Sequence, residues 1–389
     1  MHRMLRSAGQ ALLALLIALF CLLAAGPAVV RAWELEISSP KAVSAILVEP
    51  ETGRVLYEKY ADLPRAPASI AKIMLELIVL ERVQSGQLHL TDSVRVSAWA
   101  SRIGGSQVYL SENEAFTLED LLRAITISSA NDACVAVAEH IAGSAEGFVD
   151  LMNQRARELG LTHTHYVNVH GLDDEPGEGN VTTGRDIATV ARVLVTMPHV
   201  LEFSSTVEAP FRDGTFKLQN TNKLLGHFSG MDGLKTGYTA KAGFCLCGTA
   251  QRNGMRMISV IMGAESNKMR FQETARLLGA GFAQLRRNVV LDAGASIAKG
   301  VPIRGGRKTV VAAVAASPLA VILPQRVAPP EPVLVPKRGL KAPVAKGDTI
   351  ATVELRLPEG DVVSVPVVAA AAMKRATIFQ WIGRIFRRS

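Results

Sequence analysis

The chain has 389 residues, of which 48% are hydrophobic and 20% charged, and its formal net charge is +8. This length exceeds what one compact core usually holds, so we expect two domains, and the composition excludes gross disorder. The sequence holds no nucleic-acid motif and no basic platform interleaved with aromatic residues, so we expect no nucleic-acid partner; anionic lipid or a cell-wall polymer suits the positive charge better.

The first 32 residues have the pattern of a secretory signal peptide. Residues 1–6 are basic, residues 11–25 form an uncharged run rich in Leu and Ala, and Val30-Arg31-Ala32 fits a small-x-small cleavage site. The pattern predicts an exported protein that is cleaved after Ala32. An uncleaved N-terminal membrane anchor is the alternative.

Removal of the expected signal peptide, which contains Cys21, leaves Cys134, Cys245 and Cys247. An odd number argues against a disulfide framework, and we expect buried, inert thiols. The histidines between 163 and 170 are interpreted as surface or structural residues. Because no Cys or His residues stand at metal-ligand spacing, we expect no metal site and no cofactor.

The elements of the first half begin with a strand hairpin. Val43–Leu47 and Arg54–Tyr57 are β-rich runs on either side of a turn. Ile70–Val83 follows with apolar residues at helical spacing, and Phe148–Leu159 and Thr183–Thr196 are also predicted to be helical.

Between these helices lies a helix that breaks and resumes. Thr117 is a predicted N-cap with acidic residues in the first turn after it. The apolar periodicity that follows is interrupted at Ser128–Asn131 and resumes at Val135. We therefore expect Ser129 and Asn131 to lie between two helices.

The next elements are strands. Gly233–Thr239 is expected to be a strand or strand edge, and Phe244–Gln251 and Met255–Ala264 are β-type runs joined by Asn253-Gly254, a strong hairpin signal. Helices between two β-rich ends indicate an α+β domain, a mixed sheet covered by helices, over residues 33–286.

The last hundred residues differ in composition. Asn288–Val368 is rich in Val and Pro, which precludes long helices and predicts a small all-β C-terminal domain over residues 287–370, with a Pro-rich linker as the alternative. Residues 371–389 are predicted to form a terminal amphipathic helix, because from Met373 onward apolar residues that include Trp381 share one face and arginines the other. Such a helix is too short and basic to span a bilayer, so we expect it to lie on the inner-membrane surface or, alternatively, on the protein itself.

Three short motifs carry the chemistry. They are Ser69-Ile70-Ala71-Lys72, Ser129-Ala130-Asn131 and Lys235-Thr236-Gly237. Each arises often by chance, but the three in this order are typical of a serine acyl-transfer site.

Ser69 needs a base, and Lys72 lies three residues on, on the same helix face. A lysine can act as that base if burial and a neighbouring cation, which Lys235 could be, disfavour its charged form. Ser129 can relay a proton to the leaving group, and Asn131 can hold Lys72 or the substrate amide.

The third motif is suited to binding the substrate. Lys235 and Thr236 offer a cation and a hydroxyl to a substrate carboxylate, and Gly237 lets a substrate strand approach. The oxyanion would be held by backbone N–H groups of Ser69 and Tyr238. A Ser/His/Asp triad is disfavoured, because the chain has no G-x-S-x-G elbow.

The sequence resembles the low-molecular-mass penicillin-binding proteins that act as serine-type D-alanyl-D-alanine carboxypeptidases, peptidase family S11. The resemblance rests on RAPASIAKIM (65–74), ITISSANDACVAVAEHIAGS (125–144), NVHGLDD (168–174), NTNKLLGHFSGMDGLKTGYT (220–239) and MGAESNKMRF (262–271). It implies a penicillin-binding-protein/β-lactamase-like catalytic domain, peptidoglycan stem peptides and β-lactam antibiotics as partners, and a periplasmic location on the outer face of the cytoplasmic membrane.

The resemblance also implies roles for single residues. Ser69 would be the nucleophile and Lys72 its general base, with Ser129 and Asn131 as the second catalytic element. Lys235, Thr236 and Gly237 would form the strand element, and Arg270 would bind the terminal carboxylate of the substrate.

Three other functions share parts of this pattern. A class A β-lactamase is disfavoured, because no Glu-x-x-x-Asn element stands between the second and third motifs. A D,D-endopeptidase that cuts crosslinks would use the same residues. A wall-binding protein with a dead site is disfavoured by the intact motifs.

Overall fold

The computed structural model describes residues 35–173, 179–357 and 360–377. These residues divide into two compact units. The first, called here the catalytic unit, comprises Leu35–Arg287 and Ile322–Gln325. The second, called the β unit, comprises Asn288–Val321 and the described residues from Arg326 onward. The expected signal peptide lies outside the described residues.

The catalytic unit is mixed α and β. Its helices are η1 (Ala68–Ala71), α2 (Lys72–Gln84), η2 (Ala100–Arg102), α3 (Leu118–Ser128), α4 (Asn131–Ala142), α5 (Ala145–Glu158), α6 (Gly184–Leu194), α7 (Val200–Ser205) and α8 (Asn267–Gln284). Its strands are β1 (Ala42–Val48), β2 (Val55–Lys59), β3 (Ser93–Arg95), β4 (Ala115–Thr117), β5 (Glu208–Phe211), β6 (Phe216–Gln219), β7 (Met231–Thr239), β8 (Gly243–Arg252) and β9 (Met255–Ala264).

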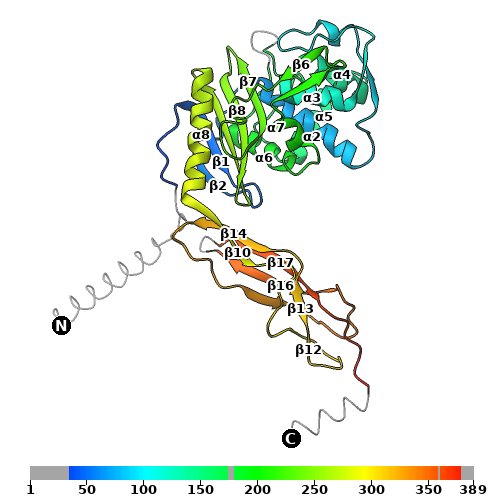
Figure 1. Cartoon of the computed structure of the whole chain (residues 1–389), viewed down its shortest axis with the longest axis vertical. Helices are drawn as coiled ribbons and strands as arrows, with labels where there is room; N and C mark the ends of the chain where they lie inside the picture. Colours follow the sequence, from blue (N-terminus) through cyan, green and yellow to red (C-terminus); the bar gives the residue numbers. More distant parts are fainter. Residues whose placement is uncertain (1–34, 174–178, 358–359, 378–389) are drawn as a thin grey trace, which may run out of the picture. The chain divides into compact units, whose positions relative to one another are not determined.

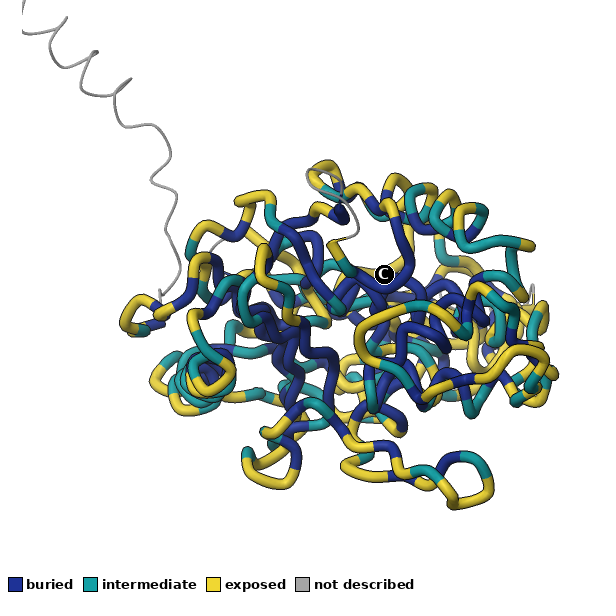
Figure 2. The backbone as a smooth tube through the Cα atoms, turned by 90° about the horizontal axis from the view of Figure 1, so that it is seen from above, coloured by how far each residue is buried: buried dark blue, intermediate teal, exposed yellow. Residues whose placement is uncertain are grey.

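A five-stranded antiparallel sheet organises this unit, in the order β2-β1-β9-β8-β7. Helix α8 covers one face, and the group of helices that includes α2 and α6 covers the other (Figure 1). Side chains alternate accordingly along β1: Leu47 packs in the apolar cluster under α8, and Ile46 in the larger cluster around α2. Figure 2 shows the buried segments in the middle of the molecule and the exposed residues on its outer loops.

Local sequence signals formed as expected in two places. Asn253 and Gly254 have φ angles of 50° and 72° and connect Arg252 to its partner Met255, so β8 and β9 form a two-residue hairpin. The Thr117 hydroxyl accepts a hydrogen bond from the Asp120 N–H at 3.1 Å and caps α3, as predicted.

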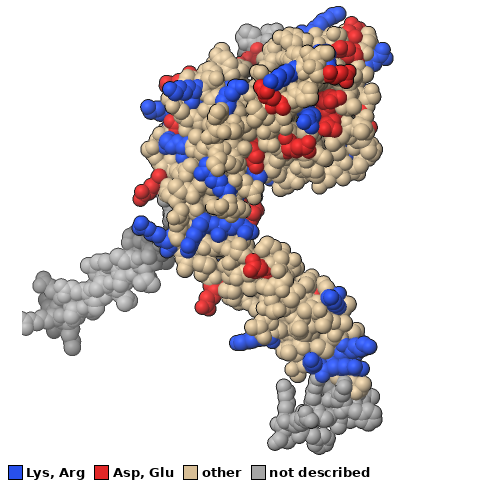
Figure 3. All heavy atoms as spheres, in the orientation of Figure 1, with Lys and Arg blue, Asp and Glu red and all other residues tan. Residues whose placement is uncertain are grey.

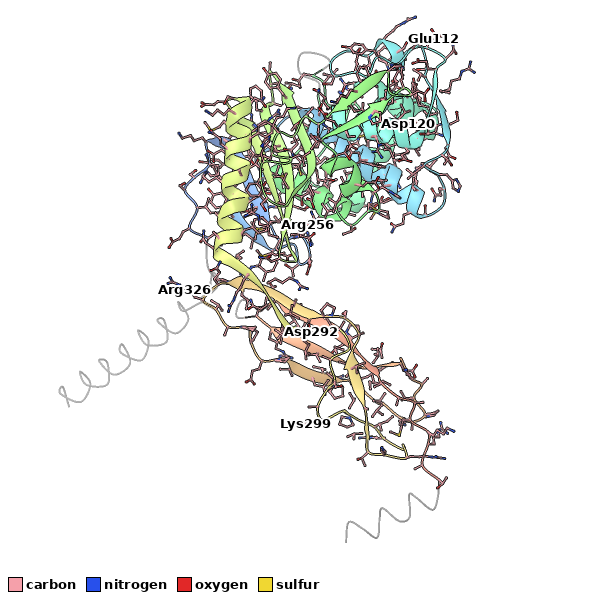
Figure 4. All side chains as sticks on the ribbon, in the orientation of Figure 1. Glu112, Asp120, Arg256, Asp292, Lys299 and Arg326 are labelled. Carbon is pink, nitrogen blue, oxygen red and sulfur yellow. The ribbon has the colours of Figure 1, made fainter. Side chains whose placement is uncertain are left out.

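Strand β7 is an edge strand, and an ion pair fixes its beginning. The Arg256 guanidinium of β9, labelled in Figure 4, donates to both carboxylate oxygens of Asp232 at 2.8 Å, across the intervening β8. It also donates to the Thr249 hydroxyl at 2.8 Å. This two-pronged contact holds the strand that carries Lys235 against its neighbour.

The β unit contains no helix among its described residues, which confirms the all-β domain and excludes the linker. Its strands are β10 (Leu285–Leu291, which begins in the catalytic unit), β11 (Val301–Pro302), β12 (Val310–Val311), β13 (Ala313–Ala315), β14 (Leu319–Pro324, which ends in the catalytic unit), β15 (Val333–Pro336), β16 (Thr349–Arg356) and β17 (Val362–Ala369). The main sheet has the order β13-β17-β16-β15. Buried residues such as Val353 and Val367 form its core.

The predicted terminal helix is wrong at its start. Met373 bridges Val344 and Arg375 bridges Gly306, so the chain is extended here and its backbone groups bond to the β unit. The rest of the predicted helix, residues 378–389, lies outside the described residues. In the described part of the chain, no helix combines the length and apolar character that crossing a membrane requires.

Two glycines in α8 provide a test of this packing. A methyl group on Gly281 would collide with the Met257 side chain under the sheet, whereas one on Gly279 would meet nothing. We expect Gly279→Ala to raise the free energy of unfolding by about 1 kcal/mol through helix propensity. Gly281→Ala should lower it by about 1–2 kcal/mol, because overpacking outweighs that gain. Urea unfolding of both variants measures the difference, and equal effects would contradict the packing of α8 described here.

Candidate functional site

Ser69 lies in a tight turn at the start of a helix. The 3-10 turn η1 begins after Pro67 and leads directly into α2, so Ser69 lies in the turn just before the regular helix. The residue before it, Ala68, has a φ of 49°, a conformation that alanine rarely adopts. Such backbone strain is common where a side chain must be aimed into a site.

Lys72 is buried beside Ser69. Its Nζ atom lies 2.8 Å from Ser69 Oγ, 2.8 Å from Asn131 Oδ1 and 2.6 Å from the His170 carbonyl oxygen. The side chain has no exposed surface. An uncharged amine has two N–H donors and one lone pair, so two acceptors can use both donors and leave the lone pair for the serine hydroxyl.

Ser129 and Asn131 lie in the break between α3 and α4, as the sequence predicts. Ser129 ends α3 with a φ of 64°, and Asn131 is the first residue of α4. The Asn131 amide donates to the Gly104 carbonyl at 2.7 Å, which fixes its oxygen toward Lys72. The described contacts do not join Ser129 directly to Ser69 or Lys72.

Strand β7 brings the third motif to the same place. Lys235 and Thr236 are almost completely buried. The Thr236 hydroxyl bonds to the Thr221 hydroxyl at 2.6 Å, and the Thr221 N–H bonds to the end of α3 at Ile127. This chain of contacts joins the strand to the helix that carries Ser129.

Gly237 has a closer neighbour than the substrate. A Cβ atom on it would lie 2.9 Å from the Pro67 carbonyl oxygen and 3.1 Å from the Ser69 nitrogen. Glycine is therefore required so that β7 can pack against the turn that carries the nucleophile. The expected role of Gly237 in substrate approach stays a prediction.

Arg270 and Tyr238 flank Gly237. The Arg270 guanidinium donates to the carbonyls of Gly237 at 2.9 Å and Cys245 at 3.3 Å, so it braces β7 from α8. Its Nε atom is buried without a partner in the described structure. The Tyr238 side chain is 55% exposed and stacks on Phe244.

The two lysines are unlike the charged residues on the surface in Figure 3, because protein surrounds them. Burial lowers the pKa of Lys72, and burial together with the Lys72 charge lowers the pKa of Lys235 to about 7. The expectation that Lys235 is the cation that disfavours the charged form of Lys72 stays a prediction, because burial is the cause that lowers the pKa of Lys72, and nearby acidic groups oppose the shift at both lysines.

His170, which the sequence treats as surface or structural, is structural. Burial and Lys72 lower the pKa of its imidazole to about 3, so the ring is neutral and only its carbonyl contacts the site. The Leu172 N–H donates to its Nδ1 at 3.2 Å.

The cysteines are buried and free, as predicted. Burial raises the pKa of Cys134 to about 12, so this thiol stays protonated although it lies near Lys72. Among the described residues, no group of three Cys, His, Asp or Glu could hold a metal ion.

Sequence reasoning missed Glu76 and Thr221. Glu76 stands four residues after Lys72 in an otherwise apolar helix, and this spacing could have revealed it. Thr221 lies within NTNKLL, at the start of a segment that carries the family resemblance, but no sequence pattern marks it as a site residue.

Comparisons with known proteins agree with this geometry. The family model described as D-alanyl-D-alanine carboxypeptidase, peptidase S11, matches residues 31–266, and the penicillin-binding protein 5 C-terminal domain matches residues 287–375. The D-alanyl-D-alanine carboxypeptidase DacF of Bacillus subtilis is 35% identical over 350 residues, which are 88% of this chain and 89% of the relative.

Solved structures show the same similarity. A peptidoglycan synthesis regulatory factor from Streptococcus pneumoniae aligns with a TM-score of 0.78 and 30% identity, over 87% of this chain and 100% of the other. Penicillin binding protein 5 from Haemophilus influenzae aligns with a TM-score of 0.71 and 30% identity, over 87% and 99%. The chain therefore belongs to the serine-type D-alanyl-D-alanine carboxypeptidases of peptidase family S11.

Proposed function

We propose that this carboxypeptidase removes the terminal D-alanine of peptidoglycan stem pentapeptides through an acyl intermediate on Ser69. One observation carries the assignment: Lys72 Nζ lies 2.8 Å from Ser69 Oγ, and it also donates hydrogen bonds to Asn131 Oδ1 and to the His170 carbonyl oxygen. That arrangement supports Lys72 as the base, because the uncharged amine would direct its lone pair at the hydroxyl proton.

In the acylation step, Ser69 Oγ attacks the carbonyl carbon of the penultimate D-alanine and its proton passes to Lys72. Backbone N–H groups of Ser69 and Tyr238 would stabilise the oxyanion that forms. When the C–N bond breaks, the leaving amine takes a proton, for which Ser129 is the relay. Water then attacks the ester, Lys72 accepts its proton, and Ser69 recovers its own as the acid is released.

Binding of the terminal carboxylate falls to Lys235 and Thr236. A buried ammonium beside a hydroxyl suits a carboxylate. Arg270 contributes positive charge from behind Gly237, and its contacts with the backbone support an indirect effect on the carboxylate more than a direct bond.

β-Lactams should acylate the same serine, because their strained amide resembles the terminal dipeptide. Penicillin-binding protein D2 from Listeria monocytogenes, solved in an ampicillin-bound form, is 34% identical over 62% of this chain, with a TM-score of 0.57. An Escherichia coli relative named D-alanyl-D-alanine endopeptidase is 30% identical over 60% of this chain and 75% of its own length. Crosslinks are therefore the alternative substrate.

The location follows from the substrate. Peptidoglycan lies outside the cytoplasm, and we propose that residues 1–32 direct export and that the basic, apolar residues 378–389 attach the enzyme to the outer face of the cytoplasmic membrane. The support is the sequence pattern of both segments.

Loss of the nucleophile tests the central assignment. We expect the wild-type enzyme mixed with benzylpenicillin to gain the mass of the drug, whereas Ser69→Ala should gain nothing and lose D-alanine release by at least about a thousandfold. Intact-mass spectrometry and D-alanine assay measure both. An adduct on Ser69→Ala would contradict the assignment, rapid drug turnover would indicate a β-lactamase, and cleavage of crosslinked dimers only would indicate the endopeptidase.

The pKa of Lys235 predicts the alkaline limb of activity. With a pKa of about 7, the ammonium is lost as pH rises through neutrality, so KM for a pentapeptide should increase above about pH 7. Lys235→Arg keeps the charge, so its KM should be higher overall but flat to about pH 9. Steady-state kinetics from pH 6 to 9 measure this, and parallel profiles would exclude Lys235 as the carboxylate partner.

Deletion of residues 378–389 tests the membrane proposal. We expect the full chain, expressed with its leader, to sediment with membranes, and the shortened chain to stay in the soluble periplasmic fraction with unchanged penicillin acylation. Replacing the arginines of this segment by glutamine should release the enzyme partly and only at high salt. A shortened chain that still sediments would assign attachment to another part of the protein.

A further inference from the structure

Glu76 extends the row that Ser69 and Lys72 begin on α2. The three residues are spaced i, i+3 and i+7, so they follow one face of the helix from its first turn inward. Glu76 is only 3% exposed, and its Oε1 atom is buried without a hydrogen-bond partner in the described structure. A carboxyl in this position costs free energy unless nearby charge compensates it.

The groups that face Glu76 come from every element packed around it. From α3 the Thr126 hydroxyl lowers the pKa of its carboxyl, and from α2 and β7 the ammonium groups of Lys72 and Lys235 act in the same direction. The thiols of Cys134 on α4 and Cys247 on β8 are also near enough to respond to its charge. Both thiols have raised pKa values and stay protonated. Asp132 also acts on Lys72 and Arg270 on Lys235, so Glu76 is the carboxyl that acts on both lysines.

The electrostatics agree with this geometry. Burial raises the pKa of Glu76 to about 7, and Lys235 opposes that rise more than Lys72 does. In turn, an ionised Glu76 raises the pKa of both lysines against the effect of burial. Without an anion, two buried ammonium groups this close would repel each other, and both would tend to lose their protons.

We propose that Glu76 is a positioning residue whose buried carboxylate is the counter-charge of Lys235, so that Lys235 keeps its proton while Lys72 gives one up. The inference rests on the proposed roles of Ser69, Lys72 and Lys235, and it explains how one lysine serves as a base and the other as a cation. Thr126 helps, because its hydroxyl lowers the pKa of this carboxyl.

The consequence for pH is specific in sign. Replacing Glu76 by glutamine removes a negative charge that raises both lysine pKa values, so both should fall. The acid limb, where Lys72 must lose a proton, then moves to lower pH. The alkaline limb, where Lys235 loses its proton, also moves to lower pH. The whole pH–activity profile therefore shifts toward acid, with both limbs moving together.

The experiment is the pH profile of benzylpenicillin acylation, from pH 5 to 10, for the full chain and Glu76→Gln. We expect both limbs to move down by at least about one pH unit, which is the effect of one charge about 12 Å away at an effective dielectric constant of about 20 and a lower bound for a closer charge. Glu273→Gln is the matched control: it is a buried carboxyl on α8, across the sheet, paired with Arg276, and its profile should stay unchanged.

A second variant tests the proposal independently if Glu76→Gln does not fold. Thr126→Val removes the hydroxyl that favours the ionised carboxyl, so it should shift both limbs in the same direction by a smaller amount. Profiles of lower height but unchanged midpoints in both variants would overturn the proposal and leave Glu76 a structural residue. Acylation that persists in Ser69→Ala would instead contradict the proposed function itself.

Discussion

The structure depends on the burial of one ammonium group. Lys72 has no exposed surface, and its Nζ atom has only three polar neighbours: a serine hydroxyl, an amide oxygen and a main-chain carbonyl. None of these is an anion, so the charged amine is poorly compensated where it sits. Burial thereby lowers the pKa of Lys72 and favours the uncharged amine, which is the form that a general base requires.

Holding that arrangement requires parts of the chain that are distant in sequence. The acceptors of Lys72 come from α4 and from the segment around residue 170, and β7 packs on the nucleophile turn through Gly237. Gly171, with a φ of 85°, also allows no side chain, because a Cβ atom there would overlap the Ala68 carbonyl. The left-handed conformation of Ala68 is kept by this packing on both sides, and it determines where Ser69 points.

Much of this could be predicted from sequence because the signals are local. The spacing of Ser69 and Lys72, the helix break before Asn131 and the Asn253-Gly254 hairpin each depend on a few adjacent residues, and all three formed. The positive φ of Ala68, the role of the His170 carbonyl and the contact of Gly237 with the nucleophile turn could not be predicted. They arise from tertiary packing, and because every residue has a backbone carbonyl, the residue type does not show which carbonyl will contact the site. The terminal helix failed at Met373 for the same reason, because bridges to the β unit outweighed amphipathic periodicity.

Glu76 shows why a buried site needs its charges considered together. Burial favours a lysine that acts as a base, because it lowers the pKa. A nearby carboxylate favours a lysine that acts as a cation, because it raises the pKa. In this site both lysines occupy one interior, where burial lowers the proton affinity of each, Lys72 lowers that of Lys235, and the carboxyl of Glu76 raises it for both. A carboxyl that acts more strongly on Lys235 than on Lys72 separates the two functions without any difference in the lysines themselves. Which lysine acts as the base and which as the cation then depends on their surroundings, and above all on Glu76, two helical turns after Ser69.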